Sequence, residues 1–233
     1  MILAFETSAK AASVALLEEG KLLGESYQNT GLTHSQTLMS MAEDLLKNCG
    51  KTPQDVTAVA VAKGPGSFTG VRIGVAAAKG FAWGAELPCY GVSTLEAMAE
   101  GLGVWNGTVV PTMDARRNQT YTAIFRVEDG KCKRLIDDCA ISVAELGEKL
   151  EYCKKPIFLV GDGAYVCYNA LNEAVAGLVL LPEHRLQQRA SGVALLAQRQ
   201  MDGGLPGDGA ELAPNYLRRS QAERERLAKE LEK

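Results

Sequence analysis

The sequence predicts an α/β protein of two similar lobes, and three observations support this class. Over residues 1–104, apolar runs of strand length alternate with helical periodicity in the order β-β-β-α-β-α-β-α. The pattern restarts near residue 105, which predicts a first lobe of residues 1–104 and a second of residues 105–233. The hairpin turn EEGK at 18–21 is matched by EDGK at 128–131. These repeats indicate duplication of one β-β-β-α unit.

The first half contains predicted strands and helices that are bounded by glycine, proline or polar turns. The opening run, Ile2–Phe5, has the length and apolar character of a buried strand. The other strands are expected at Ser13–Leu17, Leu22–Tyr27, Val56–Ala62 and Cys89–Val92, and the helices at Thr33–Asn48, Thr69–Trp83 and Thr94–Leu102.

The second half repeats this organisation. The buried run Val109–Met113 ends in Asp114, as the first strand ends in Glu6. A glycine turn at 161–163 leads into a last predicted helix, and the tail at 221–233 has the alternating charges of a solvated helix. The remaining elements are strands Thr120–Val127, Cys132–Ile136 and Ile157–Val160, and helix Val143–Leu150.

Composition excludes several functional classes. The formal net charge is −3 and the pI is near 5.6, whereas a protein that grips RNA over a broad surface is usually basic. No apolar stretch approaches the roughly 20 residues of a membrane span. No basic segment precedes the first strand, so no signal peptide is expected. We therefore expect a soluble cytoplasmic protein without a membrane partner.

Metal and disulfide chemistry is not expected either. Six cysteines occur without a C-x-x-C pair, which favours reduced and inert thiols in a cytosolic protein. The two histidines, His34 and His184, are too few for a histidine-rich metal centre. The sequence thus predicts no metal and no cofactor.

The glycine-rich stretch Gly64–Gly74 joins a predicted strand to a predicted helix. A turn of this kind exposes backbone N–H groups at the positive end of a helix, where a phosphate could bind. The Gly-Lys-Ser/Thr ending of a P-loop is missing. The other interpretation, which residue types alone favour, is a tight connection in which Ser67 or Thr69 caps the helix.

Four segments together resemble the TsaB (YeaZ) family. The opening Ile2–Ser8 with Ala12–Leu16, the stretch Gly64–Gly74, Asp114–Arg117 and Pro214–Arg218 match that family's landmarks in order and across almost the whole chain. The resemblance implies an actin/Hsp70/sugar-kinase-like fold of two ribonuclease-H-like lobes with mixed sheets. It also implies tRNA modification beside the catalytic subunit TsaD and a small ATPase, TsaE.

In the pathway of that family, TsaD transfers a threonylcarbamoyl group to adenosine 37 of tRNAs that read ANN codons. The resemblance implies that the present chain touches tRNA only indirectly. Relatives of this fold that hydrolyse ATP use acids in the cleft between their lobes. The resemblance thereby suggests a residual nucleotide site, which the expected partner role does not need, at the corresponding positions: Glu6, which replaces the usual family aspartate, Asp114, Gly161, Asp162 and Gly163.

The catalytic residues of TsaD are not reproduced. TsaD binds its metal through two helix histidines spaced i, i+4, and here Leu38 stands four residues after His34. His34 is therefore expected to be hydrogen-bonded or solvated at a helix start. No H-E-x-x-H or G-x-S-x-G motif occurs. We expect a non-enzyme, and the alternative is a small-molecule kinase or ATPase of the same fold.

The two longest predicted helices have more apolar surface than one sheet would cover. In Thr33–Asn48 the apolar arc spans roughly 160° at 100° per residue, and Thr69–Trp83 carries only two charges. Their surplus faces predict a heterodimer with TsaD, and a homodimer when the chain is alone. The expected contact residues are Leu38, Met41, Ala42, Leu45, Gly70, Ile73, Gly74, Ala77, Ala78 and Phe81.

Overall fold

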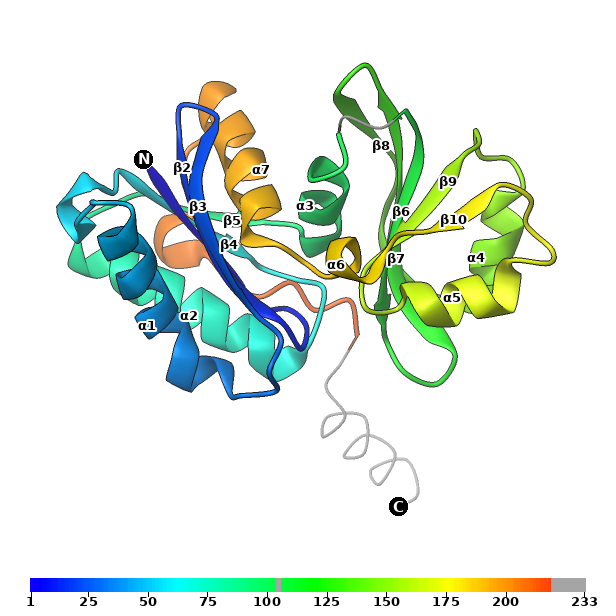
Figure 1. The fold of residues 1–233 in the computed structure, drawn as a ribbon, viewed down its shortest axis with the longest axis horizontal. Coiled ribbons are helices and arrows are strands. Elements are labelled where there is room, and N and C mark those ends of the chain that lie inside the picture. Colours follow the sequence, from blue (N-terminus) through cyan, green and yellow to red (C-terminus); the bar gives the residue numbers. More distant parts are fainter. Residues whose placement is uncertain (104–105, 219–233) are drawn as a thin grey trace.

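The computed structural model describes residues 1–103 and 106–218, so the predicted tail helix lies outside the described residues. Two five-stranded mixed sheets form two lobes side by side (Figure 1). The strand orders are β3-β2-β1-β4-β5 and β10-β9-β6-β7-β8. The first three strands of each lobe form an antiparallel meander, and the next two add in parallel. The α/β class and the internal repeat are thus confirmed.

The first sheet is covered on both faces. Along β1, Leu3 and Phe5 point into one core while Ile2 and Ala4 point into another, as the two-residue period of a strand requires. Burial on both sides explains why the sequence is a continuous apolar run. The strands are β1 (Ile2–Glu6), β2 (Ala12–Glu18), β3 (Lys21–Gln28), β4 (Ala58–Ala62) and β5 (Cys89–Val92).

Helices from distant parts of the chain cover this sheet. On one face lie α1 (His34–Asn48) and α2 (Phe68–Gly84), near their predicted bounds. On the other face lies α7 (Ala190–Asp202), which contacts β1, β2, β4 and β5. The predicted division at residue 104 is therefore wrong for α7, a helix that was not predicted from the sequence and that returns to the first lobe. Short turns η1 (Pro53–Asp55) and η2 (Gly209–Glu211) also belong here.

The second sheet has a longer meander and shorter parallel strands. β8 continues six residues beyond the predicted Ile136, because its polar second half still pairs with β7. The strands are β6 (Gly107–Asp114), β7 (Gln119–Glu128), β8 (Lys131–Ser142), β9 (Ile157–Val160) and β10 (Leu178–Leu180), and the helices are α4 (Val143–Leu150), α5 (Ala164–Leu171) and α6 (Glu183–Leu186).

The helix α3 (Thr94–Glu100) joins the two lobes. Its Leu95 and Met98 belong to the core of the second lobe, whereas Ala97 faces α7. The helices approach closely there, since a Cβ added to Gly192 of α7 would lie 2.1 Å from the carbonyl oxygen of Ala97. The helix α3 thus follows β5 of the first lobe and packs on the second, whereas α7 follows α6 of the second lobe and packs on the first (Figure 1).

None of the helices that the structure describes is long and apolar enough to span a bilayer.

Candidate functional site

The first of the predicted cleft acids, Glu6, is a buried residue at the end of β1. Its exposed fraction is 1%, and its Oε1 accepts a hydrogen bond from the backbone N–H of Ser8 at 2.6 Å. Burial raises the pKa of the Glu6 carboxyl from 4.5 to about 7. In this arrangement the carboxyl group is enclosed by protein and is not presented to a ligand in the cleft.

The structure brings the second and third predicted acids into the same region. Asp162 is close enough for its charge to raise the pKa of Glu6, and Asp114 has the same effect on Asp162. Burial is the main reason that the pKa of Asp162 lies above its ordinary value, and its Oδ1 accepts a hydrogen bond from Nε2 of the buried Gln188 at 3.3 Å. Asp114 is exposed at the end of β6.

The glycines at 161–163 have a packing role. Gly161 has a positive φ of 105°, and a Cβ there would lie 2.1 Å from the carbonyl oxygen of Thr112. A Cβ on Gly163 would lie 2.9 Å from the backbone carbon of Met113. The N–H of Gly161 donates to the carbonyl of Leu186, in the segment that packs over this turn. These contacts account for both glycines without a nucleotide.

The glycines of the stretch Gly64–Gly74 let the start of α2 pack closely against the loop that follows β1. Ser67 caps the helix by accepting from the N–H of Gly70 at 3.3 Å, so the capping interpretation is confirmed. A Cβ at Gly70 would lie 2.1 Å from the carbonyl oxygen of Thr7, and one at Gly74 would lie 2.3 Å from Oγ1 of Thr7. Gly70 and Gly74, which were expected to contact a partner, thus pack inside the lobe.

The C-terminal segment connects these landmarks. The N–H of Asn215 donates to the carbonyl of Lys63, and the guanidinium of Arg218 donates to the carbonyl of Ala115, both at 2.6 Å. The Tyr216 ring stacks on Phe68 at the start of α2, with centroids 4.5 Å apart. The segments that carry the family resemblance therefore meet between the lobes, although they are scattered along the sequence (Figure 1).

His34 is explained by a local contact. It is the first residue of α1, and its Nε2 lies 2.8 Å from the carbonyl oxygen of Ala9. The expectation of a hydrogen-bonded histidine at a helix start is confirmed. Within residues 1–103 and 106–218, no three His, Cys, Asp or Glu side chains are grouped to hold a metal.

The cysteines that the structure describes are all free and buried or half-buried. Burial raises the pKa of the Cys89 and Cys167 thiols to about 11 and that of Cys132 to about 12. Such thiols carry almost no thiolate at neutral pH, which agrees with the prediction of inert side chains.

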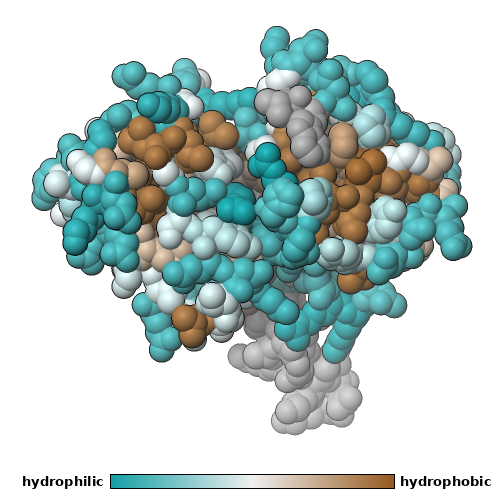
Figure 2. All heavy atoms as spheres, in the orientation of Figure 1, coloured by the Kyte–Doolittle hydropathy of each residue, from teal (hydrophilic) through white to brown (hydrophobic). Residues whose placement is uncertain are grey.

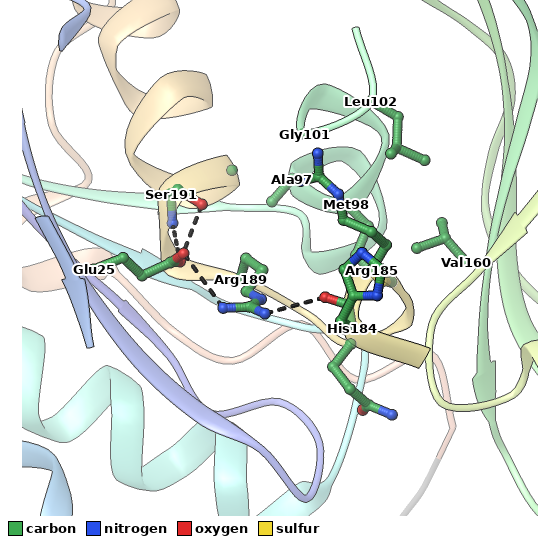
Figure 3. Close-up of a pocket in the computed structure, with 12 residues that line it drawn as sticks. Glu25, Ala97, Met98, Gly101, Leu102, Val160, His184, Arg185, Arg189 and Ser191 are labelled. Carbon is green, nitrogen blue, oxygen red and sulfur yellow. Dashed lines mark hydrogen bonds and ion pairs between the residues drawn. The ribbon is translucent and has the colours of Figure 1, made fainter. Parts of the chain in front are cut away.

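A cavity of about 430 Å³ lies between the lobes, beside α3, α6 and the start of α7 (Figure 3). Glu25 of β3 accepts hydrogen bonds from the N–H and Oγ of Ser191 at 2.9 and 3.0 Å, and pairs with Arg189 at 3.6 Å. Arg189 also donates to the carbonyl of His184, another residue that lines the cavity. The charges of Glu25 and Arg189 thus compensate each other in the cavity wall.

The predicted partner surface needs correction. Periodicity identifies the apolar arc of a helix, but it cannot tell whether the helix's own sheet or a partner covers it. Here the sheet covers most of it, so the following predicted contacts are core residues of the lobe: Leu38, Met41, Ala42 and Leu45 on α1, and Gly70, Gly74 and Ala78 on α2. Ile73, Ala77 and Phe81 remain half-buried at the margin of this core.

The outward surface of these helices has other apolar residues. The side chain of Trp83 is 87% exposed near the end of α2, and that of Met39 is 45% exposed on α1. Nothing lies within 4 Å of a Cβ added to Gly80. A second cavity, of about 480 Å³, lies beside Trp83 and Gly80. Sequence reasoning missed Trp83, although a tryptophan at the end of a helix of small residues was the available signal.

Known proteins resemble this chain over nearly its whole length. Residues 28–226 match the family model of TsaD, described as tRNA N6-adenosine threonylcarbamoyltransferase. The chain is 33% identical to the tRNA threonylcarbamoyladenosine biosynthesis protein TsaB of Bacillus subtilis, over 95% of this chain and 96% of the relative. It is 34% identical to the protein of the same name from Escherichia coli, with the same coverage.

Solved structures agree on the fold. YeaZ from Pseudomonas aeruginosa superposes with a TM-score of 0.76 at 27% identity, covering 93% of this chain and 99% of that protein. Component A of the (R)-2-hydroxyglutaryl-CoA dehydratase of Acidaminococcus fermentans superposes with a TM-score of 0.52 at 16% identity, covering 86% of this chain and 98% of that one. The actin/Hsp70/sugar-kinase-like fold that the resemblance implied is confirmed.

Proposed function

The chain belongs to the TsaB family, and we propose that it serves as a non-catalytic partner of a TsaD-type protein. The proposed reaction is threonylcarbamoyl transfer to adenosine 37 of tRNAs that read ANN codons. In this proposal the chain holds the TsaD-type protein in a competent state, and TsaE joins as a third subunit. The relatives' names support the pathway.

The burial of Glu6 supports the non-catalytic role. An acid that held a metal–nucleotide complex would need its carboxylate ionised and open to the ligand. Glu6 is instead enclosed, with a pKa near 7 and the N–H of Ser8 as its partner. The glycines at 161 and 163 are accounted for by packing on β6. These contacts disfavour the alternative of a kinase or ATPase.

The observation that carries the proposed partnership is the outward face of α1 and α2. Trp83 and Met39 leave a large aromatic ring and a flexible thioether in solvent, and such side chains are enriched where proteins bind each other. Ala76 and Gly80 are also exposed on α2, and their small size would let a second helix approach the α2 backbone closely. The cavity beside Trp83 adds a recess for a partner side chain.

The match to the TsaD model supports the choice of partner. It covers residues 28–226, which include both helices, so a TsaD-type protein is expected to carry a similar pair. Two similar helix pairs can face each other across an approximate two-fold axis. The same geometry would give a homodimer when the TsaD-type protein is absent.

Size-exclusion chromatography with light scattering tests this function. The chain is measured alone and after mixing with TsaD from the same genome at micromolar concentration. A one-to-one species that replaces any homodimer is expected. Two unshifted peaks would overturn the proposal, and calorimetry with ATP and magnesium would then test the kinase alternative, for which a Kd below ~10 μM with turnover is required.

A further inference from the structure

The arginines of this chain fall into two groups. Arg126, Arg134, Arg189 and Arg199 each form a salt bridge with a carboxylate. Among residues 1–103 and 106–218, the other arginines have no carboxylate partner: Arg72, Arg116, Arg117, Arg185 and Arg218. Their positive charge is therefore available to an external anion.

Four of these five arginines are connected through local contacts. Arg72 lies on α2, where its Nε donates to the Tyr216 hydroxyl at 2.7 Å. Two residues after Tyr216, Arg218 donates to the carbonyl of Ala115. Ala115 directly precedes Arg116 and Arg117 in the β6–β7 turn. We call the set Arg72, Arg116, Arg117 and Arg218, together with Phe68 and Tyr216, the arginine strip.

Aromatic rings hold the first member of the strip in place. The guanidinium carbon of Arg72 lies 3.8 Å from the centroid of the Phe68 ring, and Phe68 stacks on Tyr216. Arg72 is exposed, and its terminal N–H groups are directed to no carboxylate within the described chain. A guanidinium that is already ordered on an aromatic surface loses less conformational entropy when it binds a phosphate.

The β6–β7 turn holds the next two members in an unusual backbone conformation. Arg116, Arg117 and Asn118 have φ values of 62°, 57° and 57°, the left-handed region that residues with a Cβ avoid. The N–H of Arg116 donates to Oδ1 of Asp114 at 2.7 Å, and this contact helps to hold the turn. Both arginine side chains are exposed. Strained backbone of this kind occurs preferentially at functional sites.

We propose that the arginine strip binds the phosphate backbone of tRNA directly, whereas the resemblance implied only indirect contact, and this inference rests on the proposed function. Guanidinium groups match phosphate oxygens in geometry, and the half-exposed Tyr216 ring offers a stacking surface for an unpaired base. Figure 2 shows a hydrophilic surface over the β6–β7 turn at the lower edge of the second lobe. The strip is local, so it is compatible with a net charge of −3.

Fluorescence anisotropy with 5′-fluorescein-labelled tRNA tests the strip on the complex with TsaD and on the chain alone. The variant Arg116→Asn/Arg117→Asn removes two charges and keeps a residue that tolerates the left-handed region. The control is Arg185→Asn, at an exposed arginine outside the strip. We expect the double variant to raise Kd at least fivefold at 100 mM salt and the control to change it less than twofold.

The salt dependence gives a second readout. Each lost phosphate contact should reduce the magnitude of the slope of log K against log salt by about 0.7 to 0.9, so the double variant should reduce it by roughly 1.4 to 1.8. An unchanged Kd and slope, with normal pairing and thermal unfolding, would overturn the strip while the proposed partnership stands. If the chain does not pair with TsaD, the anisotropy titration of the chain alone with tRNA at 50 mM salt is the test. Equal binding by the natural chain and the double variant would then overturn the strip.

Discussion

The carboxyl of Glu6 and the backbone N–H of Ser8 form a 2.6 Å hydrogen bond inside the protein, at the end of β1. The bond favours the ionised carboxylate, whereas burial opposes it more strongly and holds the pKa near 7. Glu6 is therefore a group whose protonation changes near neutral pH at the centre of the fold.

This pKa predicts that folding stability decreases as pH rises. Between pH 4.5 and about 7, the folded chain keeps the Glu6 proton while the unfolded chain releases it. The free energy of unfolding should fall across this window by about 3 kcal/mol, the value that a shift of this size implies, and then level off. Asp162, whose pKa is also raised by burial, changes stability in the same direction.

Glu6→Gln isolates the contribution of Glu6. The amide keeps an acceptor for the N–H of Ser8 and carries no charge, so the variant should be more stable than the natural chain at pH 8 and similar at pH 5. Urea unfolding at the two pH values measures the difference. Parallel pH profiles for both proteins would show that Glu6 does not titrate in this range.

A second prediction compares two glycines of α2. Gly70→Ala would place a Cβ 2.1 Å from a backbone oxygen, so we expect a loss of roughly 3 kcal/mol as the helix or the β1–β2 loop moves. Gly80→Ala places its Cβ in open space on the same helix and should raise the free energy of unfolding by about 0.5 to 1 kcal/mol. Thermal unfolding measures both variants, and equal shifts in Tm would contradict the close packing of α2 on the loop after β1.

A third prediction concerns pairing with TsaD. Ala76 is exposed on the outward face of α2, so Ala76→Arg should leave the fold intact and weaken the proposed heterodimer at least tenfold by steric and desolvation costs. Ala77→Arg should act in the same way from the half-buried margin. Light scattering measures pairing, and Tyr165→Arg, on the exposed side of α5, is the control. Normal pairing by both α2 variants would exclude this surface.

Leu38→Glu is not a suitable test of pairing. Leu38 is 1% exposed in the core of the first lobe, where a carboxylate has no partner of opposite charge. We expect this variant to unfold the lobe, with a loss of about 4 kcal/mol or more. Circular dichroism should show the loss of structure directly, and a folded Leu38→Glu protein would argue against the packing of α1.

A fourth prediction concerns the contact between α3 and α7. The carboxylate of Glu100, which is 8% exposed, pairs with Arg199 of α7 at 2.5 Å. Arg199→Met leaves this carboxylate unpaired and should cost about 2 kcal/mol at pH 8, a value reduced because Arg199 is half exposed. The double variant with Glu100→Gln should recover most of the loss, and no recovery would show that the pair does not couple.

The sequence predicted most helices and strands of the first lobe, but it did not predict which elements pack against each other. Buried strands such as Ile2–Phe5 are recognisable because they are apolar runs of strand length between turns. The helix α7 was itself not predicted, and its return to the first sheet could not be, because periodicity carries no information about which sheet a helix covers. The strand Leu178–Leu180 was missed, since three residues give no measurable period.

The candidate nucleotide site and partner surface were predicted only in part, because the sequence does not show which distant segments cover a residue. The acids at 6, 114 and 162 were placed together correctly, because carboxyl ends of central strands meet between the lobes. Whether an acid is enclosed depends on distant segments such as Gln188, which the sequence does not place. The glycines at 70 and 74 were assigned to a partner helix, but their neighbour is Thr7 of the same lobe.

The exchange of α3 and α7 between the lobes has a consequence during synthesis. One face of the first sheet is covered by α7, so this lobe cannot complete its core until the ribosome has released residue 202. Two separately expressed halves, cut near residue 104, would each lack a helix that the other carries. We therefore expect the two lobes to fold as a single cooperative unit, even though the sequence repeats one plan twice.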